Sequence, residues 1–337
     1  MLRKGGYFQA DKPNPLVESS IMHKLPMLTA RHVDHRNYPP GVAYMDGQYL
    51  PIQEAKLSVL DYGFLHSDAT YDVVHVWKGA FFRLGDHLER FFRGMAELHM
   101  SIPYGKAQVA EFLHNCVALS GLENAYVEFI CTRGTSPDFS RDPRDAENRF
   151  IAFAIPFGSV ANKEQMERGL HLALTDVLRI PPSSVDPTVK NYHWLDMVKA
   201  LYAAYERGAD TAVLLDTNGN VSEGPGFNII AVKDGKVSTP NLSVLLGVTR
   251  QTIFDLCAEM GIQCHAQDIT VEDLKSTDEV FVTSTAGGVM PVSTIDGQPV
   301  GSGEVGLLSK LMMALYWQLH EDDRYRSVVS YPGSTEQ

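Results

Sequence analysis

The stretch Asp186-Pro-Thr-Val-Lys-Asn-Tyr-His-Trp-Leu-Asp196 has Lys190 at its centre. Two prolines upstream, Pro181 and Pro182, predict a loop that leads to this lysine, and an apolar pattern from about 192 to 207 predicts a helix after it. Desolvation beside the aromatic residues of the stretch favours the neutral, nucleophilic form of an amine, which covalent chemistry with an aldehyde requires. A solvated lysine at a helix start is the alternative interpretation.

Length and composition limit the possible function classes. A chain of 337 residues with 44% apolar content is long enough for a large core and two domains. A net charge of -12 without a basic cluster argues against nucleic acid or an anionic membrane as a partner. No apolar run approaches the roughly 20 residues of a membrane span, and no secretory signal is expected. The cysteines and histidines lack metal-site spacing, so we expect no metal, and buried thiols in a cytoplasmic protein: Cys116, Cys131, Cys257 and Cys264.

The chain divides into five predicted segments. Residues 1–40 form an irregular, proline-containing arm, 41–156 a smaller α/β domain, 157–162 a linker, 163–325 a larger domain and 326–337 a C-terminal tail. The first domain opens with a hairpin around Asp46-Gly47, has a second hairpin over 70–84, and continues with a helix capped near Asp86. Strands and helices are mixed without regular alternation. This favours an α/β (α+β) fold whose second domain has a barrel-like mixed sheet.

Three segments after Lys190 carry further chemistry. Val221-Ser-Glu-Gly-Pro-Gly-Phe-Asn228 places Glu223 at a tight turn, where its carboxylate could pair with a pyridinium nitrogen or simply face solvent. Leu245-Leu-Gly-Val-Thr-Arg250 stands where a helix predicted from about Val248 to Met260 begins, and the first N–H groups of such a helix form a phosphate site. Thr283-Ser-Thr-Ala-Gly-Gly288 ends an apolar strand with hydroxyls and small residues that let the backbone approach an anion.

In this order, the four segments resemble the fold-type IV pyridoxal-phosphate (PLP) enzymes, from about Gly41 to His320. The motifs that carry the resemblance are Val189-Lys-Asn-Tyr-His-Trp194, Glu223-Gly-Pro-Gly-Phe-Asn228, Gly247-Val-Thr-Arg250 and Thr285-Ala-Gly-Gly288. The resemblance implies that Lys190 is the Schiff-base lysine and proton shuttle and that Glu223 pairs with the pyridine nitrogen. It implies phosphate contacts from Arg90, Val248, Thr249 and Thr285. Pro225 is a departure, because many members carry a small hydroxyl residue there.

The stretch from Asp61 to Trp77 indicates the branch of the family. Branched-chain aminotransferases tend to carry a Phe-Glu-Gly run where this chain has Tyr71-Asp72-Val73, and the valine crowds a carboxylate site built around glycine. D-amino acid aminotransferases place an Arg-x-His trap after Thr-Arg-Gly-Thr-Ser-Pro, whereas Asp138 follows that run here and would repel a carboxylate.

The segment from Leu65 to Gly79 and the position of Trp194 most resemble the (R)-selective amine transaminases. Alternation on the predicted strand 125–131 puts Tyr126 and Glu128 on one face, which by the resemblance lines the substrate pocket. Arg141 and Arg144 could bind an acceptor carboxylate or lie in a solvated loop. The resemblance also implies a homodimer with the active site near the subunit interface. The implied substrate pocket comprises His66, Tyr71, Val73, Tyr126, Glu128, Trp194, Leu246, Thr285 and Ala286.

The resulting hypothesis is a ping-pong PLP transaminase that moves an amino group from an (R)-amine donor to an α-keto acid acceptor such as pyruvate. Three alternatives remain open. The chain could be a D-amino acid or branched-chain amino acid aminotransferase, an aminodeoxychorismate-type PLP lyase, or a non-catalytic relative. The intact pair of Lys190 and Glu223 argues against the last.

Overall fold

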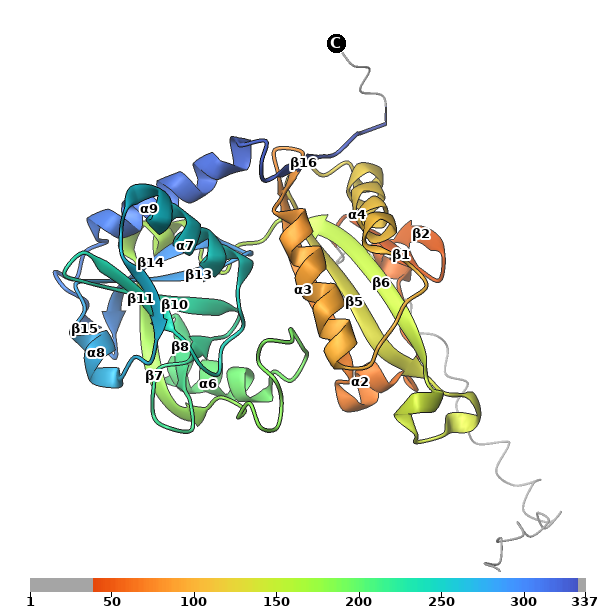
Figure 1. Ribbon diagram of the computed structural model, residues 1–337, viewed down its shortest axis with the longest axis horizontal. Coiled ribbons are helices and arrows are strands. Elements are labelled where there is room, and N and C mark those ends of the chain that lie inside the picture. Colours follow the sequence, from red (N-terminus) through yellow and green to blue (C-terminus); the bar gives the residue numbers. More distant parts are fainter. Residues whose placement is uncertain (1–38, 333–337) are drawn as a thin grey trace, which may run out of the picture. The chain divides into compact units, whose positions relative to one another are not determined.

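A computed structural model describes residues 39–332. The predicted N-terminal arm therefore lies almost wholly outside the described residues, as does the end of the C-terminal tail. The described chain contains two β-sheets, each covered by helices (Figure 1). This agrees with the predicted α/β fold with a mixed second sheet.

The first sheet is antiparallel and has the strand order β16-β4-β3-β5-β6-β1-β2. Helices α3 (Leu84–Glu97) and α4 (Lys106–Ser120) cover one face of it (Figure 1). Their apolar sides and the facing strand residues, Phe91 and Phe129 among them, form one buried core. The short helix α2 (Tyr62–His66) precedes β3. The strands are β1 (Val42–Met45), β2 (Gln48–Pro51), β3 (Ala69–Trp77), β4 (Ala80–Phe82), β5 (Ala125–Thr135), β6 (Glu147–Pro156) and β16 (Arg326–Val328).

The second sheet mixes parallel and antiparallel pairs in the order β12-β11-β10-β13-β14-β7-β8, with β9 paired to β10 and β15 to β14. It curls toward closure because Val221, just before β9, bridges to Leu215 on β8. This curl matches the barrel-like sheet expected from the sequence. The strands are β7 (Leu170–Leu178), β8 (Thr211–Leu215), β9 (Glu223–Gly224), β10 (Phe227–Lys233), β11 (Lys236–Pro240), β12 (Cys264–Gln267), β13 (Glu279–Ser284), β14 (Gly288–Ile295) and β15 (Gln298–Pro299).

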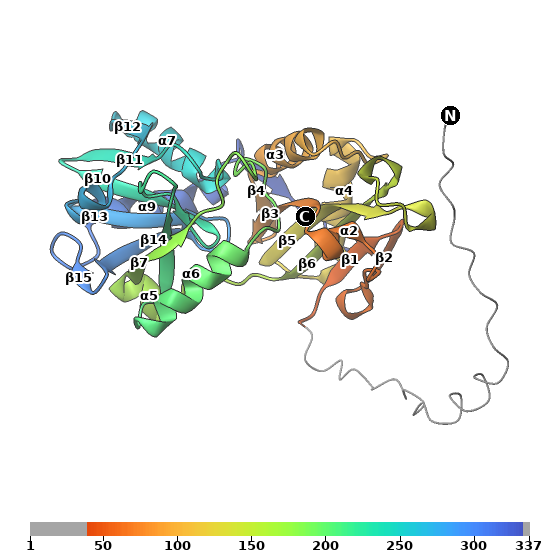
Figure 2. The ribbon, with the colours of Figure 1, turned by 90° about the horizontal axis from the view of Figure 1, so that it is seen from below.

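Helices pack on the second sheet in two groups. Helix α6 (Leu195–Glu206) lies beside β7 and β8, and α5 (Lys163–Arg168) lies near it (Figure 2). Helices α7 (Val248–Met260) and α9 (Leu307–Gln318) pack on β10, β13 and β14, while α8 (Val271–Lys275) precedes β13. The α7 boundaries agree with the helix that the sequence predicts.

The helix after the lysine starts later than the sequence suggested. Residues 192–194 lie outside α6, and Trp194 is its N-cap residue. The segment stays outside the helix because Asn191 bridges to Thr70 of β3. The Lys190 carbonyl also accepts hydrogen bonds from the Thr70 hydroxyl (2.8 Å) and the Tyr71 N–H (3.1 Å). Residues 179–194, between β7 and α6, form the lysine loop, which is thus hydrogen-bonded to the first sheet.

The helix expected to be capped near Asp86 is instead capped three residues earlier. Its N-cap residue is Arg83, in the left-handed region at φ 56°. Asp86 lies in the first turn, where a carboxylate is favourable, and pairs with Arg83. The guanidinium of Arg83 also donates to Asp255 of α7 at 2.7 Å, so this helix start is tied to the second set of helices.

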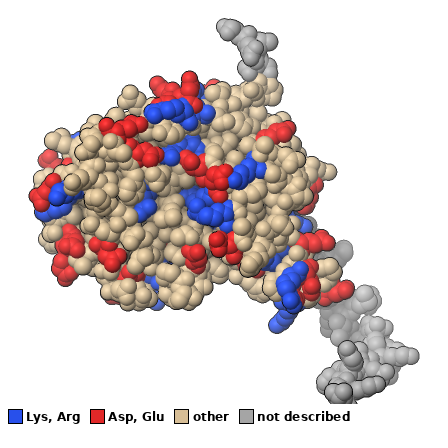
Figure 3. All heavy atoms as spheres, viewed as in Figure 1, with Lys and Arg blue, Asp and Glu red and all other residues tan. Residues whose placement is uncertain are grey.

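Residues 326–328, which the sequence assigned to a tail, form β16 and pair with β4 at the edge of the first sheet. Acidic and basic side chains form scattered groups on the face in Figure 3, and in several places they adjoin one another. Across residues 39–332, no helix has the length and apolar character needed to span a bilayer.

Candidate active site

A cavity of about 340 Å³ brings together most of the residues singled out in the sequence. Its lining comes from β3 and β5 of the first sheet, the lysine loop, and the β9–β10, β13–β14 and α7 regions of the second. Of the predicted cofactor and substrate residues, those that line it are Lys190, Arg90, Glu223, Val248, Thr249, Thr285, Tyr71, Val73, Tyr126, Trp194 and Ala286.

Lys190 is half-buried and lies over an aromatic ring. Its Nζ is 4.6 Å from the ring centroid of Tyr71, a cation–π distance. The ring of Tyr192 stacks on that of Tyr71 with a centroid separation of 4.3 Å and an interplanar angle of 4°. Because the backbone of Lys190 is bonded to β3, the amine is presented to the cavity from a fixed direction.

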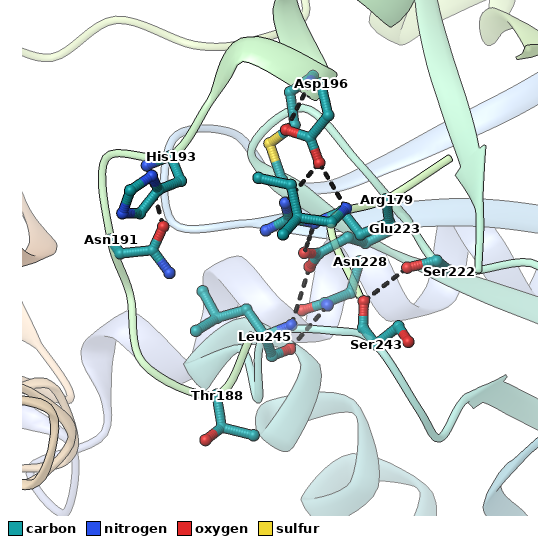
Figure 4. A network of polar contacts seen from close by, with 12 residues as sticks. Arg179, Thr188, Asn191, His193, Asp196, Ser222, Glu223, Asn228, Ser243 and Leu245 are labelled. Atoms are coloured by element: carbon teal, nitrogen blue, oxygen red, sulfur yellow. Dashed lines mark hydrogen bonds and ion pairs between the residues drawn. The ribbon is translucent and has the colours of Figure 1, made fainter. Parts of the chain in front are cut away.

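Glu223 lies at the centre of a buried ionic network (Figure 4). It is 4% exposed, and its two oxygens accept from Arg179 Nε at 3.0 Å and the Leu245 N–H at 2.9 Å. Arg179 Nη1 also donates to Asp196 at 2.7 Å. Burial raises the pKa of Glu223, and the charge of Arg179 and the Leu245 N–H counteract that rise. Since both partners are N–H donors, the arrangement suits an ionised carboxylate.

The first turn of α7 forms another part of the lining. Val248 and Thr249 are buried there, behind the N-cap residue Gly247. A Cβ at Gly247 would lie 2.2 Å from Asn228 Oδ1, so the close packing requires glycine. Asn228 Nδ2 donates to the Leu245 carbonyl at 2.9 Å and fixes the approach to the helix (Figure 4). An N-terminal turn of this kind is suited to an anion.

Two polar groups near this turn have unused hydrogen-bonding capacity within residues 39–332. The buried Thr283 Oγ1 lines the cavity and has no hydrogen-bond partner in that range. Arg90 uses three of its five N–H groups there, two toward Asp72 at 2.7 and 2.8 Å and one toward the Leu246 carbonyl at 3.1 Å. The remaining two N–H groups of Arg90 are available to an anion.

Asp72 orients Arg90 from β3. It is fully buried, and it also accepts from His87 Nδ1 at 2.8 Å. Burial alone would raise the pKa of Asp72, but the charges and hydrogen bonds of Arg90 and His87 lower it well below its usual range. The carboxylate is therefore charged, and it compensates the guanidinium beside the cavity.

The wall formed by β3 and β5 carries a second buried carboxyl group. Tyr126 donates to Glu128 at 2.9 Å and Tyr192 donates to the other oxygen at 2.5 Å. The predicted common face for Tyr126 and Glu128 is therefore present. Glu128 lies behind the lining, and burial raises its pKa while the two hydroxyls counteract that rise.

Several predicted residues lie away from this cavity. Leu246 is exposed, although its carbonyl binds Arg90. His66 stacks on Tyr62 and lines a neighbouring hollow with His193. Arg141 and Arg144 lie on the exposed loop between β5 and β6, where Arg144 is paired with Asp142. Asp138, which the sequence analysis expected to repel a substrate carboxylate, is exposed on the same loop and does not line the cavity.

Arg179, Asp196 and Tyr192 were not predicted as site residues, whereas Thr283 stands in a segment that the sequence indicated for anion binding. Arg179 directly precedes Ile180-Pro-Pro182, and an arginine at the end of an apolar strand was a signal of a buried ion pair. Asp196 follows the lysine by six residues and looked like an ordinary first-turn acid. The hydroxyl of Tyr192 had no visible partner in the sequence, because Glu128 is distant along the chain.

Comparisons with known proteins agree on one family. The family model described as amino-transferase class IV matches residues 69–295. A Methanocaldococcus jannaschii protein, provisionally named a branched-chain-amino-acid aminotransferase, is 33% identical over 79% of this chain and 92% of its own. A D-alanine aminotransferase of Staphylococcus haemolyticus is 28% identical over 79% of this chain and 93% of its own. The solved structure of a branched-chain aminotransferase from the thermophilic archaeon Thermoproteus uzoniensis with norvaline has a TM-score of 0.79 and 27% identity, covering 86% of this chain and 99% of its own.

Proposed function

The chain belongs to the class IV aminotransferases, and on that premise we propose that it transfers the amino group of an (R)-amine to an α-keto acid such as pyruvate. As a member of this family it is a PLP-dependent aminotransferase of fold-type IV that acts on small molecules. Family membership does not specify the hand of the amine or the acceptor, so both are proposed.

The cavity residues fit PLP. The buried Thr283 Oγ1 without a partner in the described chain, the two unused N–H groups of Arg90 and the first turn of α7 supply donors for a phosphate. Glu223 offers a carboxylate for the ring nitrogen, and Lys190 an amine for the aldehyde. Thr249 and Thr285 would contribute further hydroxyls.

When bound, PLP supplies an aldehyde that takes up the amino group and a ring that withdraws electrons from the substrate carbon. Lys190 would then carry the proton to and from that carbon on the side from which its Nζ enters the cavity. Glu223 would keep the proton on the ring nitrogen, and Arg179 holds the Glu223 carboxylate in place at 3.0 Å. The stack of Tyr71 and Tyr192 limits where the amine of Lys190 can move.

The observation that carries the preference for an amine is the pairing of the cavity arginines. Arg90 is bound to Asp72 and Arg179 to Glu223 and Asp196, so each guanidinium in the lining already faces a buried carboxylate. Val73 takes up space on the wall formed by β3 and β5, and Glu128, an acid with no ion pair in the described part of the chain, lies behind that wall. A donor without a carboxylate suits such a wall better than an amino acid does.

The amine hypothesis is tested with a panel of single-enantiomer donors. We expect (R)-1-phenylethylamine with pyruvate to exceed its (S)-enantiomer, D-alanine and L-leucine, the last two assayed with 2-oxoglutarate. D-alanine or L-leucine as far the best donor would establish one of the activities named for the relatives. Pyruvate formed only from aminodeoxychorismate would establish the lyase alternative.

Four further features are proposed, of which the homodimer is implied by the family resemblance and the others rest on the sequence pattern. We propose a homodimer, a cytoplasmic location, the domain boundaries 41–156, 157–162 and 163–325, and acceptor binding by Arg141 or Arg144. Exposed apolar side chains on α6, including Leu195 and Tyr202, support a surface covered by a second copy. Sedimentation at several protein concentrations tests the dimer.

A further inference from the structure

The strand register directs Glu128 toward the substrate side of the first sheet. In the β3–β5 pair Val73 lies opposite Glu128, and His75 lies opposite Tyr126. Directly opposed residues of an antiparallel pair project from the same face, and residues two apart on one strand do as well. Since Val73 and Tyr126 line the cavity, Glu128 lies on the cavity face, directly behind the Tyr126 hydroxyl.

Glu128 differs from the other buried carboxylates at this cavity in its partners. Asp72 faces Arg90, and Arg179 lies between Glu223 and Asp196. Glu128 is 9% exposed and binds only the hydroxyls of Tyr126 and Tyr192. No cation within residues 39–332 forms an ion pair with it, although the charge of Lys190 acts on it from beyond ion-pair distance. A phenol orients a carboxylate without cancelling its charge. The negative charge therefore acts on whatever occupies the adjacent end of the cavity.

The fixed position of Lys190 gives the cavity two distinguishable ends. The amine enters from one direction, since the Lys190 carbonyl is bonded to β3 and Nζ lies over Tyr71. A substrate carbon has its nitrogen directed to the cofactor and its hydrogen directed to Lys190. With these two positions fixed, its other two substituents point to opposite ends of the cavity. The two enantiomers of an amino acid then differ only in which end receives the carboxylate.

We propose that Glu128 is a specificity-determining residue, which excludes a substrate carboxylate from the Tyr126 end of the cavity and thereby sets the hand of the amino acid that the enzyme makes or consumes. This proposal rests on the proposed function, because it requires that one cavity binds both the amine and the keto acid. A keto acid binds with its carboxylate away from Glu128, and the amino group is delivered to one face of its carbonyl carbon.

The hand of alanine formed from pyruvate tests this inference. The PLP-loaded enzyme is run at low conversion with whichever donor of the panel gives turnover, and the two alanine enantiomers are separated by chiral chromatography. We expect one enantiomer to predominate with the native enzyme. In Glu128→Gln, which keeps the length and hydrogen-bonding capacity of the side chain, the ratio should fall about ten- to a hundredfold, the effect of two like charges at separations within such a cavity.

Tyr192→Phe is the matched control, because it removes a hydroxyl from the cluster and leaves the charge. We expect this variant to keep the native ratio within about threefold, whatever its rate. Glu128→Met is a second neutral variant should the glutamine protein fail to fold. An unchanged ratio in the neutral variants, an equal loss in Tyr192→Phe, or a native enzyme without preference would overturn the inference. A poor amine donor with an altered alanine ratio would instead contradict only the proposed function.

Discussion

Two buried carboxylates flank Lys190, and their surroundings differ. Glu223, on the second sheet, binds a guanidinium and a backbone N–H (Figure 4). Glu128, on the first sheet, binds two phenols. N–H groups can only donate, so they hold Glu223 ionised. Phenol oxygens can both donate and accept, so they accommodate Glu128 with or without its proton.

The two environments suit two different tasks, one toward the cofactor ring and one toward the substrate. A carboxylate that must keep one charge state is paired with a cation and buried to 4% exposure, as expected for the partner of a cofactor ring. A carboxylate that acts on substrates through its charge has no ion-pair partner within residues 39–332, at the cost of an unfavourable burial. Lys190 belongs to both regions, since its neighbours Tyr71 and Tyr192 connect it to Glu128.

The largest effect is expected for Lys190→Ala, which removes the residue that the two regions share. Turnover should fall by at least the roughly 10²- to 10⁴-fold that a positioned acid–base group contributes. PLP should still bind through its phosphate contacts, as dialysis and absorbance would measure. Borohydride reduction of the native protein followed by peptide mapping provides the control. Label on a lysine other than Lys190 would contradict the assignment.

Arg179→Met tests whether Glu223 depends on its cation. The substitution leaves Glu223 and Asp196 buried with no guanidinium, and breaking a buried pair typically costs about 3–5 kcal/mol. Urea unfolding of the PLP-loaded protein should show this loss. The double variant Arg179→Met with Glu223→Gln should recover part of it, because one unpaired charge is removed. A loss below about 1 kcal/mol would mean that the ion pair does not support the site.

Glu223→Gln tests the role of the Glu223 charge itself, and its expected effect is smaller than the preceding ones. The fold should persist, while turnover slows by about ten- to a hundredfold, since one charged hydrogen bond of roughly 1.5–3 kcal/mol is lost where the ring nitrogen needs it. Measured kcat with the best donor is the test, and PLP content is the control. Activity within twofold of the native enzyme would reduce Glu223 to a structural residue of the turn.

The sequence predicted the elements that depend on local pattern. The boundaries of α7 and the hairpin at Asp46-Gly47 follow from apolar periodicity and turn chemistry, and they are present as expected. The predicted start of α6 was wrong because the irregular segment before it is hydrogen-bonded to β3, a contact between residues distant along the chain. Tertiary bonds of this kind leave no periodic trace.

The site residues also fall into two groups, those in recognisable sequence segments and those that only the folded chain brings together. Lys190, Glu223 and Thr249 stand in recognisable segments, so the sequence located them at the cavity. Arg179 was missed because its importance comes from Glu223 and Asp196, which reach it only in the folded chain. Likewise, the common face of Tyr126 and Glu128 follows from strand alternation, whereas the hydroxyl of Tyr192 that completes the cluster comes from the lysine loop.

The smallest effect is expected from pH, and it separates the two carboxylates without any change in the native sequence. Burial raises the pKa of Glu128 above the ordinary value of 4.5, so this group takes up a proton at a higher pH than an exposed glutamate does. As the pH falls through that raised pKa, the charge disappears, and the enantiomer ratio of alanine formed from pyruvate should decline toward that of Glu128→Gln. Initial-rate product ratios from about pH 8 down to the acid limit of activity measure this decline. The variant has no carboxyl group at this position, so its ratio should stay flat. A parallel decline in both proteins would assign the pH effect to another group.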